Sequence, residues 1–307
     1  MPWPVKVPPR GLDDLLARIH TAFPELAWTD AELVTEGWDH EVVILDRRIV
    51  FRFPNDELYR AGLATEVAVL DRLATHASLA IPRYSYLPSD GSFAGYPLVP
   101  GDPLSPEGLA ALAGGQRSAI AEQLGRFLGT LHTLEAQGHR FDDVDGSHIT
   151  SEQEAIRETM ERHLPAVLSP ADLAVARTIM DNVGALIATP RPTTLIHGDV
   201  YASHLLWDGP AGQLGLIDFS DMAHDDPAID LAELHELGTD FVDDVYEAYT
   251  GPKDPTFLER AWTYQRWVAV FLMTDHFAYG KTTFAVARET FDDVKHHPAR
   301  PDPGWQP

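Results

Sequence analysis

The stretch from residue 195 to residue 230 constrains the fold of this chain more than any other. It holds two short apolar runs, and each run ends in a turn that carries an aspartate, Asp199 after the first and Asp218 after the second. Apolar runs this short, bounded by turn residues, are typical of buried strands. Asp226 and Pro227 then begin a helix, because aspartate caps a helix N-terminus and proline fits the first helical turn. The sequence thus predicts two strand ends that each present a carboxylate, followed by a capped helix.

The order of the polar residues in this stretch matches the order of functional groups in a kinase. Kinases place a catalytic aspartate first, a metal ligand five residues later and a second metal-binding aspartate after the next strand. Asp199, His204 and Asp218 occupy those positions. Asp199 would orient the acceptor alcohol, and Asp218 would hold Mg²⁺ against the phosphates. A single aspartate in a turn is most often only a turn former, so the prediction rests on the spacing of all three.

His204 departs from the protein-kinase pattern, which has an asparagine at this position. Imidazole is a poorer ligand for Mg²⁺ than oxygen is. This leaves four alternatives for His204. It binds Mg²⁺ weakly, it binds Mn²⁺ instead, it contacts phosphate or the acceptor, or it is a packed loop residue. We expect Asp230 to brace the catalytic loop and His197 to be a structural hydrogen-bonding residue beneath it.

The composition excludes several classes of function. The 307-residue chain has no cysteine and a formal net charge of −24. This charge argues against nucleic acid or an anionic membrane as a partner, because both attract basic surfaces. No apolar run is long enough to span a bilayer, and the N-terminus has no apolar signal segment. We expect a cytoplasmic, monomeric protein that acts on small molecules.

The negative charge is concentrated around the central stretch. No lysine or arginine lies between Arg191 and Lys253, whereas carboxylates recur from Asp199 to Glu247. Solubility accounts for much of the overall excess, but such a wall of carboxylates needs cations. A divalent metal and a cationic acceptor would supply them.

The first third of the chain predicts a small lobe rich in β-strands. Helical spacing occurs over 11–23 and 57–76, and strand patterns occur over 31–35, 41–45, 49–53, 83–87 and 96–99. A segment rich in proline and glycine follows at 100–103 and indicates a domain boundary.

The rest of the chain is mostly helical, with apolar periodicity over 107–136, 151–168, 171–188, 227–250 and 255–295. We therefore expect an α+β fold of two lobes, similar to that of a protein kinase. The nucleotide-binding lobe would span 1–99, and the hinge 100–105. The larger helical lobe, with the catalytic loop and the acceptor site, would span 106–297, and a flexible tail 298–307.

Arg52 is the small-lobe cation that would face the phosphates. It lies on the predicted strand 49–53, where kinases carry a lysine that pairs with a helix glutamate, and no lysine lies between Lys6 and Lys253. Its planar guanidinium suits phosphate, and Glu66 on the next helix is its natural partner. The alternative is an exposed surface arginine. Gly37, in the first turn of the lobe, is a further nucleotide-binding candidate. It would cover the phosphates mostly by its position, because a single glycine does not make a phosphate-binding loop.

Together these residues resemble the aminoglycoside phosphotransferase-like kinases over roughly residues 30–290. The resemblance rests on His197-Gly198-Asp199 with Asp218, on Arg52 with Glu66, and on the predicted helix end Leu131-His132. It is closest to the macrolide 2′-phosphotransferase branch. That branch is indicated by Gly37-Trp38-Asp39, by arginine for lysine in 50–54, by His204 in place of asparagine, and by the run 216–230. His40, where asparagine is common, is a departure.

The resemblance implies a kinase that inactivates a macrolide antibiotic by phosphorylating the 2′-hydroxyl of its amino sugar. It implies GTP as the preferred donor and ATP as another. Asp199 would be the base, with His204 and Asp218 at Mg²⁺ or Mn²⁺. Arg52 and Glu66 would lie at the phosphates, and the purine would lie against the hinge near three residues: Tyr96, Leu98 and Val99.

The implied acceptor, a macrolide with a dimethylamino sugar, suits the carboxylate-rich stretch. We expect Asp226 and its neighbours to receive the dimethylammonium. Apolar side chains of the helices that follow would face the lactone ring: Leu231, Leu234, Trp267, Phe271 and Phe277. Aromatic residues at helical spacing are more often core than pocket, so we expect only some of these to line the site.

Two alternatives stay open. One is a kinase of the same fold that acts on an aminoglycoside or another small hydroxylated amine or metabolite. The other is a non-catalytic nucleotide-binding pseudokinase, which the intact Asp199 and Asp218 disfavour but which His204 and the missing lysine favour.

Overall fold

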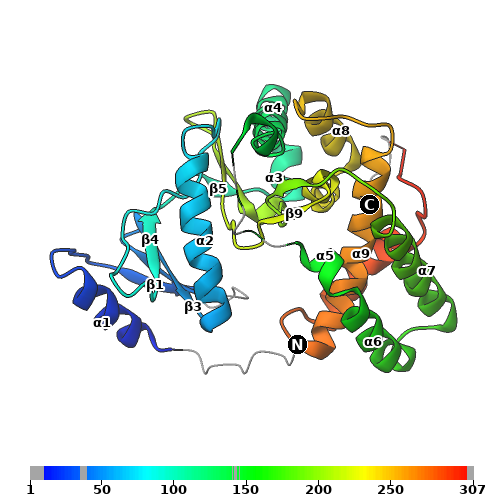
Figure 1. The fold of residues 1–307 in the computed structure, drawn as a ribbon, viewed down its shortest axis with the longest axis horizontal. Helices are drawn as coiled ribbons and strands as arrows, with labels where there is room; N and C mark the ends of the chain where they lie inside the picture. Colours follow the sequence, from blue (N-terminus) through cyan, green and yellow to red (C-terminus); the bar gives the residue numbers. More distant parts are fainter. Residues whose placement is uncertain (1–9, 35–39, 140, 142–143, 145, 303–307) are drawn as a thin grey trace.

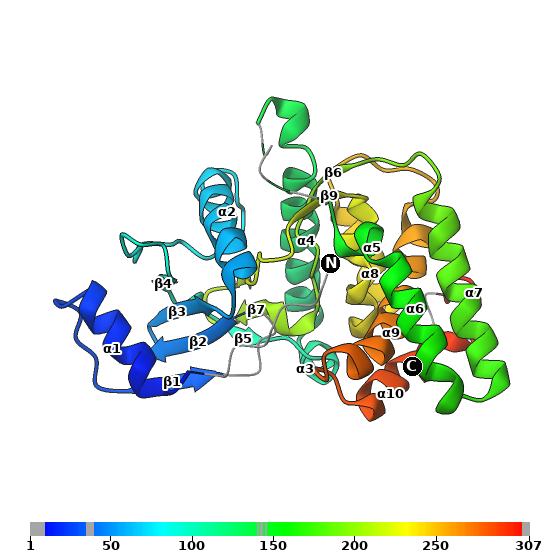
Figure 2. The ribbon, with the colours of Figure 1, turned by 60° about the horizontal axis from the view of Figure 1, so that its bottom comes forward.

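A computed structural model describes residues 10–34, 40–139, 141, 144 and 146–302. These residues form two lobes (Figures 1 and 2). In Figure 1 the sheet-rich N-terminal lobe, blue and cyan, lies at the left, and the helical C-terminal lobe, green to red, lies at the right. The predicted small β-rich lobe and the larger helical lobe are both present.

The N-terminal lobe is built on a four-stranded antiparallel sheet. Its strands lie side by side in chain order: β1 (Ala31–Val34), β2 (His40–Leu45), β3 (Ile49–Pro54) and β4 (Ala94–Pro97). One face of the sheet, through Phe51 and Phe53, packs against Leu15 and Ile19 of helix α1 (Leu12–Ala22). The amphipathic helix predicted at 11–23 therefore covers this face.

The other face of the sheet meets the C-terminal lobe. Val50 of β3 is buried together with Leu206 of the C-terminal lobe, and Val42 of β2 packs beside them. Val42 lies opposite Arg52 in the register of β2 and β3, and opposed residues point to the same face of a sheet. Arg52 therefore shares the face that looks toward the other lobe.

Helix α2 (Glu57–Leu73) follows β3 and is capped by Asp56, whose side chain accepts the Tyr59 N–H at 3.0 Å. The strand predicted at 83–87 is reduced to a bridge between Tyr86 and Gly95, because only that residue pair exchanges backbone hydrogen bonds. After β4 the chain reaches β5 (Asp102–Pro103), which already pairs with a strand of the C-terminal lobe.

The C-terminal lobe consists mainly of helices: α3 (Pro106–Ala111), α4 (Gly114–Leu131), α5 (His148–Ser151), α6 (Gln153–His163), α7 (Pro170–Ile187), α8 (Thr239–Ala248), α9 (Phe257–Ala278) and α10 (Phe284–Lys295). The 3₁₀ turns that the structure describes among them are η1 (Glu135–Gln137), η2 (Leu164–Ala166), η3 (Ala202–His204), η4 (Pro227–Leu231) and η5 (Glu233–Leu237). Their apolar sides form one large core.

Three of the predicted helices are divided in the structure. The segment 227–250 becomes η4, η5 and α8, because Gly238 with φ of +101° turns the chain before α8. The segment 255–295 becomes α9 and α10, which are separated at Gly280 with φ of +65°. The segment 107–136 divides into α3 and α4 at Leu112, whose ψ of 148° is extended.

Two small antiparallel strand pairs hold the central stretch. β6 (Thr194–Ile196) pairs with β9 (Ala223–Asp225), and β7 (Leu205–Asp208) pairs with β8 (Gln213–Leu216). Asp199 follows β6 and Asp218 follows β8, which confirms the two predicted strand ends. Asp226 caps the next element as predicted, since it accepts the Ala228 N–H at 3.0 Å, but that element is the 3₁₀ turn η4.

The start of the predicted tail packs against the helical lobe. Arg300 donates to Asp243 of α8, Pro301 is buried, and the Trp262 indole donates to the His297 carbonyl at 3.0 Å. The prediction of a flexible tail is therefore wrong for residues 298–302, and residues 303–307 lie outside the described part of the chain. Among the described residues no helix combines the length and apolar character needed to cross a membrane.

Candidate active site

The loop that carries Asp199 depends on a glycine. Gly198 takes a backbone φ of +88°, which residues other than glycine adopt only with strain. A Cβ atom on Gly198 would lie 2.2 Å from the carbonyl oxygen of Asp221, so the loop leaves no room for one. The sharp turn places Asp199 directly after the buried end of β6.

Asp230 holds this loop from within the core. Its carboxylate accepts the backbone N–H of His197 at 2.9 Å and that of Gly198 at 2.8 Å. His132 Nε2 donates to the same carboxylate at 2.9 Å, and the Tyr249 hydroxyl donates to His132 Nδ1 at 2.9 Å. Burial acts to raise the pKa of Asp230, but the hydrogen bonds from His132 and from the Gly198 N–H outweigh it and lower the pKa. The structure thus places Asp230 where the sequence expects a brace.

His197 connects the two strand ends. Its Nε2 lies 3.2 Å from the carbonyl of Ile217, and its Nδ1 accepts the N–H of Asp199 at 3.3 Å. Burial lowers the pKa of His197 to about 4, so the ring is neutral at pH 7. This arrangement matches the predicted structural role.

His204 lies between the two predicted catalytic aspartates. Its Nδ1 is 3.0 Å from the Asp199 carbonyl oxygen, and its Nε2 is 3.7 Å from Oδ2 of Asp218. A carbonyl can only accept, so Nδ1 carries a proton and donates it to Asp199, and Nε2 is the ring nitrogen that faces Asp218.

Asp218 is held in an uncommon conformation, with φ of +62°. Its Oδ1 accepts from Arg52 Nη2 at 2.7 Å and from the Ser220 hydroxyl at 2.9 Å, while Oδ2 faces His204. Burial alone would raise the pKa of Asp218, but the charge of Arg52 lowers it far below its ordinary range. The carboxylate is therefore ionised and suited to a divalent cation.

Asp218 Oδ2 and His204 Nε2, 3.7 Å apart, are the side-chain atoms at this point that could hold a metal ion. No group of three or more histidine, aspartate or glutamate side chains placed to hold a metal occurs in the part of the chain that the structure describes. One carboxylate and one imidazole fit a Mg²⁺ or Mn²⁺ ion that keeps water and phosphate oxygens as its other ligands.

Arg52 joins the two lobes at this point. Its Nη1 donates to both carboxylate oxygens of Glu66, at 2.7 and 2.8 Å, and its Nη2 donates to Asp218 at 2.7 Å. The Tyr84 hydroxyl supports the pair by donating to Glu66 at 2.9 Å. Arg52 is 5% exposed, which overturns the alternative of a surface arginine.

The predicted purine-side residues are divided between the interlobe cluster and the surface. Tyr96 and Val99 are buried with Val50 of the N-terminal lobe and Leu206 of the C-terminal lobe. Leu98, which follows the end of β4 at Pro97, is instead 37% exposed, so it does not join them. Gly37 lies outside the described residues.

The expected acceptor role of Asp226 is not compatible with its position. Asp226 is fully buried, and its Oδ2 accepts from Arg260 Nε at 2.7 Å and from the Tyr264 hydroxyl at 3.0 Å. A substrate cation cannot reach this carboxylate, because Arg260 already neutralises it inside the core.

Three of the apolar residues expected at the acceptor belong to the core instead. Leu231 and Leu234 have no exposed surface, and Trp267 is 4% exposed. They lie on the inner sides of η4, η5 and α9, where these elements pack together. The helical spacing of these residues therefore reflected core packing.

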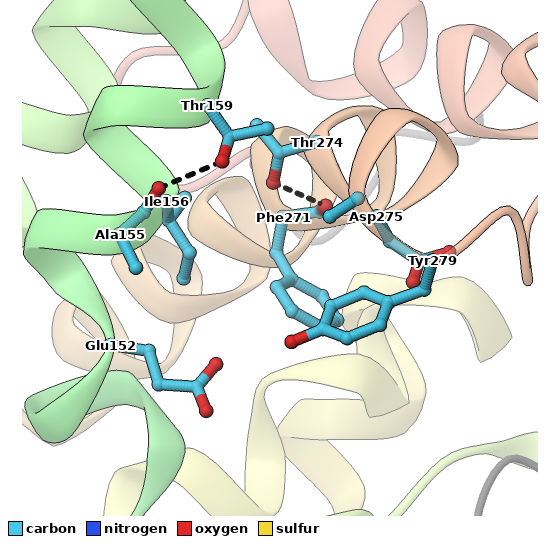
Figure 3. Close-up of a pocket in the computed structure, with 9 residues that line it drawn as sticks. Glu152, Ala155, Ile156, Thr159, Phe271, Thr274, Asp275 and Tyr279 are labelled. Atoms are coloured by element: carbon cyan, nitrogen blue, oxygen red, sulfur yellow. Dashed lines mark hydrogen bonds between the residues drawn. The ribbon is translucent and has the colours of Figure 1, made fainter. Parts of the chain in front are cut away.

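Phe271 and Phe277 are only partly buried. Phe271 lines a small pocket between α6 and α9, where the Tyr279 hydroxyl points toward Glu152 (Figure 3). The pocket has room for about one water molecule, with a volume of about 10 Å³. Phe277 stacks on His163 with ring centroids 4.9 Å apart. The pocket beside Phe271 is therefore too small to hold a lactone ring.

Much of the carboxylate-rich stretch is neutralised by arginines from elsewhere in the chain. Salt bridges join Arg52 to Asp218, Arg191 to Asp225, Arg260 to Asp226, Arg117 to Asp240 and Arg300 to Asp243. The prediction that a metal and a substrate must supply the cations is therefore wrong for Asp225, Asp226, Asp240 and Asp243, whereas Asp218 keeps Oδ2 directed at His204.

A smaller carboxylate cluster lies beside the predicted base. Burial, and then the charges of Asp199, Glu236 and Asp221, raise the pKa of Glu233 well above its ordinary value. Sequence reasoning named none of the three neighbours of Asp199, although Glu233 and Glu236 both follow the capped turn. We define these four residues as the acceptor-side cluster.

Comparison with known proteins agrees with this geometry. The sequence model of the phosphotransferase enzyme family matches residues 30–264. The solved GDP and kanamycin complex of APH(2")-IIIa has a TM-score of 0.80 and 23% identity, covering 92% of this chain and 98% of that one. A streptomycin–ATP complex of APH(2")-IIa has a TM-score of 0.68 and 16% identity, covering 95% and 99%.

A macrolide enzyme is also similar. The macrolide 2′-phosphotransferase MphH from Brachybacterium faecium has a TM-score of 0.61 and 21% identity, covering 94% of this chain and 99% of that one. At these identities the structural likeness establishes the kinase-like fold, and the predicted fold class is confirmed.

Proposed function

Because this chain belongs to the phosphotransferase enzyme family, we propose that it transfers the γ-phosphoryl group of a nucleoside triphosphate to a hydroxyl of an amino-sugar antibiotic. One observation carries the proposal. Asp199, His204 and Asp218 come together where Arg52 of the N-terminal lobe meets the C-terminal lobe. This arrangement supports a base, two metal ligands and a phosphate-side cation at a single point.

In the proposed reaction Asp199 accepts a hydrogen bond from the acceptor hydroxyl and directs its oxygen at the γ-phosphorus. The O–P bond to the acceptor forms as the bond to the β-phosphate oxygen breaks, and the hydroxyl proton moves to Asp199. Phosphoryl transfer needs mainly such positioning and charge stabilisation. The fixed Gly198 turn and the Asp230 brace supply the positioning.

A divalent cation would be held by Asp218 Oδ2 and His204 Nε2, and it would neutralise charge that develops on the phosphates. His204 keeps Nε2 available by donating Nδ1–H to the Asp199 carbonyl. Arg52 and Ser220 fix the Asp218 carboxylate by binding Oδ1.

A polycationic acceptor of the aminoglycoside type is favoured by the acceptor-side cluster. Burial and the negative charges of the other three carboxylates make Glu233 costly to ionise. Several ammonium groups of an acceptor would offset the repulsion among these carboxylates. The higher TM-score of the kanamycin complex supports the same choice.

Phosphorylation of the 2′-hydroxyl of a macrolide amino sugar is the second candidate, and either reaction would confer antibiotic resistance. His204 and Arg52 favour it through the resemblance described above, and the fold of a macrolide 2′-phosphotransferase is similar. Against it, the residues expected to face the lactone are buried or enclose too little space.

GTP is the proposed donor, and ATP is the second choice. A similar structure carries GDP and another carries ATP, and both nucleotides would place a purine against Val50, Tyr96 and Val99. A non-catalytic nucleotide-binding protein is disfavoured because Asp199 and Asp218 are both present and ordered beside His204.

The experiment is a transfer assay with purified protein, GTP or ATP, and kanamycin or erythromycin. Asp199→Asn should lower kcat by about 10²–10⁴-fold, since it removes the group that orients the acceptor and takes its proton. Its nucleotide affinity should stay unchanged. Asp208→Asn is the matched control, because Asp208 ends β7 and only caps a turn by accepting the Ala211 N–H at 3.1 Å. Equal activity of Asp199→Asn and wild type would overturn the assignment.

A further inference from the structure

The terminal nitrogens of Arg52 have no hydrogen left for a phosphate. One Nη1–H bridges the two oxygens of Glu66, at 2.7 and 2.8 Å, and the other faces the Tyr84 hydroxyl at 3.4 Å. Nη2 donates to Asp218 Oδ1 at 2.7 Å and to His40 Nδ1 at 3.2 Å. Each terminal nitrogen of a guanidinium carries two hydrogens, so these contacts use all four. A phosphate bound here needs a further donor or must displace one of these partners.

His40 is placed on the interlobe face of the sheet, next to Arg52. In β2 the residues His40, Val42 and Ile44 alternate onto one face, and Val42 and Ile44 pack into the interlobe cluster. The His40 side chain is 4% exposed, and the charges of Arg52 and Asp218 both act on its ring. His40 therefore lies next to Arg52 and close enough to Asp218 for its charge to act on the ring.

The contact with Arg52 fixes which His40 nitrogen carries a proton. A guanidinium can only donate, so Nδ1 must accept and Nε2 must carry the hydrogen. Burial, and then the charge of Arg52, lower the pKa of His40 to about 3, so this neutral tautomer persists at pH 7. The Nε2 atom is buried and has no hydrogen-bond partner among the described residues.

A buried N–H without a partner is costly, and native proteins seldom keep one without a purpose. We propose that His40 donates its Nε2–H to a phosphate oxygen of the bound nucleoside triphosphate. This inference rests on the proposed function. Arg52 has no spare donor for a phosphate, because Glu66, Asp218 and His40 occupy its terminal nitrogens. The inference assigns the phosphate contact to the neutral imidazole of His40 instead.

Two substitutions separate phosphate binding from support of Arg52. In His40→Asn the amide oxygen can replace Nδ1 as the acceptor from Arg52, but no N–H reaches the position of Nε2. In His40→Gln the amide nitrogen can occupy the position of Nε2. Binding of GTP, GDP and guanosine is measured by calorimetry for wild type and both variants.

We expect His40→Asn to weaken GTP and GDP binding about 10-fold, as for a lost hydrogen bond to a charged acceptor, and to leave guanosine binding unchanged. His40→Gln should stay within about 3-fold of wild type. Equal affinities of His40→Asn and wild type for GTP, or an equal loss for guanosine, would overturn the inference.

A measurement on the wild-type protein keeps the test independent of variant folding. In protein with ¹⁵N-labelled histidine, the Nε2–H resonance of His40 should shift on addition of GTP and stay in place with guanosine. If the Nε2–H resonance of His40 does not shift with GTP although the protein still transfers the phosphoryl group, the inference about His40 is contradicted and the proposed function is not. Wild-type protein that binds no GTP or ATP would instead overturn the proposed function and this inference together.

Discussion

At the scale of single residues, the buried aspartates Asp226 and Asp230 lie four positions apart but have different roles. Asp230 binds two backbone N–H groups of the catalytic loop, so its loss would disturb the position of Asp199. Asp226 binds Arg260 and Tyr264 inside the core and has no exposed surface. The spacing of acidic residues alone does not distinguish these roles, because it does not reveal that Arg260 lies against Asp226.

Asp226→Asn tests this distinction. The change leaves the buried Arg260 without a full counter-charge, which should lower the free energy of unfolding by about 3 kcal/mol. The KM for the acceptor should stay the same. Urea denaturation and steady-state kinetics measure the two quantities.

Asp254→Asn is the matched control for this prediction. Asp254 binds the same arginine at 2.8 Å, but its side chain is 33% exposed, so its loss should cost about 1 kcal/mol or less. An acceptor KM that rises strongly in Asp226→Asn at unchanged stability would restore the substrate role that its burial contradicts.

At the scale of elements, the close packing of α4 on α8 depends on glycine. A Cβ on Gly125 of α4 would lie 2.4 Å from the carbonyl oxygen of Val245 in α8. Backbone atoms cannot move aside as a flexible side chain can. The two helices therefore approach as closely as they do only because Gly125 has no side chain.

Gly125→Ala should thus destabilise the protein by about 1–3 kcal/mol through overpacking. Gly184→Ala offers the opposite outcome, because Gly184 lies within α7 and a Cβ there meets nothing within 4 Å. It should stabilise the protein by about 0.5–1 kcal/mol, since alanine favours a helix. Thermal unfolding of the two variants should move in opposite directions, and a shift in the same direction would contradict this account of the helix contact.

The elements also show what the sequence could predict. Asp199, His204 and Asp218 could be located because they lie within one short stretch whose spacing is set by two strands. The Arg52–Glu66 pair could be predicted because strand alternation places Arg52, and helix spacing places Glu66, on the inner face of its element. The breaks at Gly238 and Gly280 were missed, since a single glycine in an apolar pattern is compatible with a continuous helix.

The contacts that were not predicted join residues far apart in the chain. His40 meets Arg52 across a strand pair, and Arg260 reaches Asp226 from another helix, so neither contact has a local signal. The acceptor side depends on how several helices and 3₁₀ turns pack, which periodicity does not specify. For that reason burial turned Leu231 and Leu234 from expected pocket residues into core.

At the scale of the whole molecule, buried neutral histidines couple folding to pH. Burial lowers the pKa of His197 and of His235 to about 4, and burial with the charge of Arg52 lowers that of His40 to about 3, from an ordinary value of 6.5. Between these values and 6.5 the unfolded chain binds protons that the folded chain does not. Folding therefore becomes less favourable as the pH falls through this window.

Each such histidine should contribute a loss of about 1.4 kcal/mol per pH unit between pH 6 and pH 4.5. His235→Gln removes one of them on the core side of η5, where the ring packs against Trp262 and Nδ1 bonds the Ala232 carbonyl at 2.8 Å. The slope of unfolding free energy against pH should become shallower by that amount, as measured by denaturation at several pH values. Parallel curves for variant and wild type would contradict the assignment.

We propose that this protein phosphorylates an amino-sugar antibiotic at the site formed by Asp199, His204 and Asp218. The most direct measurement incubates the purified protein with GTP and Mg²⁺ and with either kanamycin or erythromycin, and identifies the products by mass spectrometry. We expect one added phosphoryl group, a higher kcat/KM for kanamycin than for erythromycin, and loss of both products in Asp199→Asn. Bound nucleotide with no phosphorylated amino sugar, or a product that forms equally well without the Asp199 carboxylate, would contradict it.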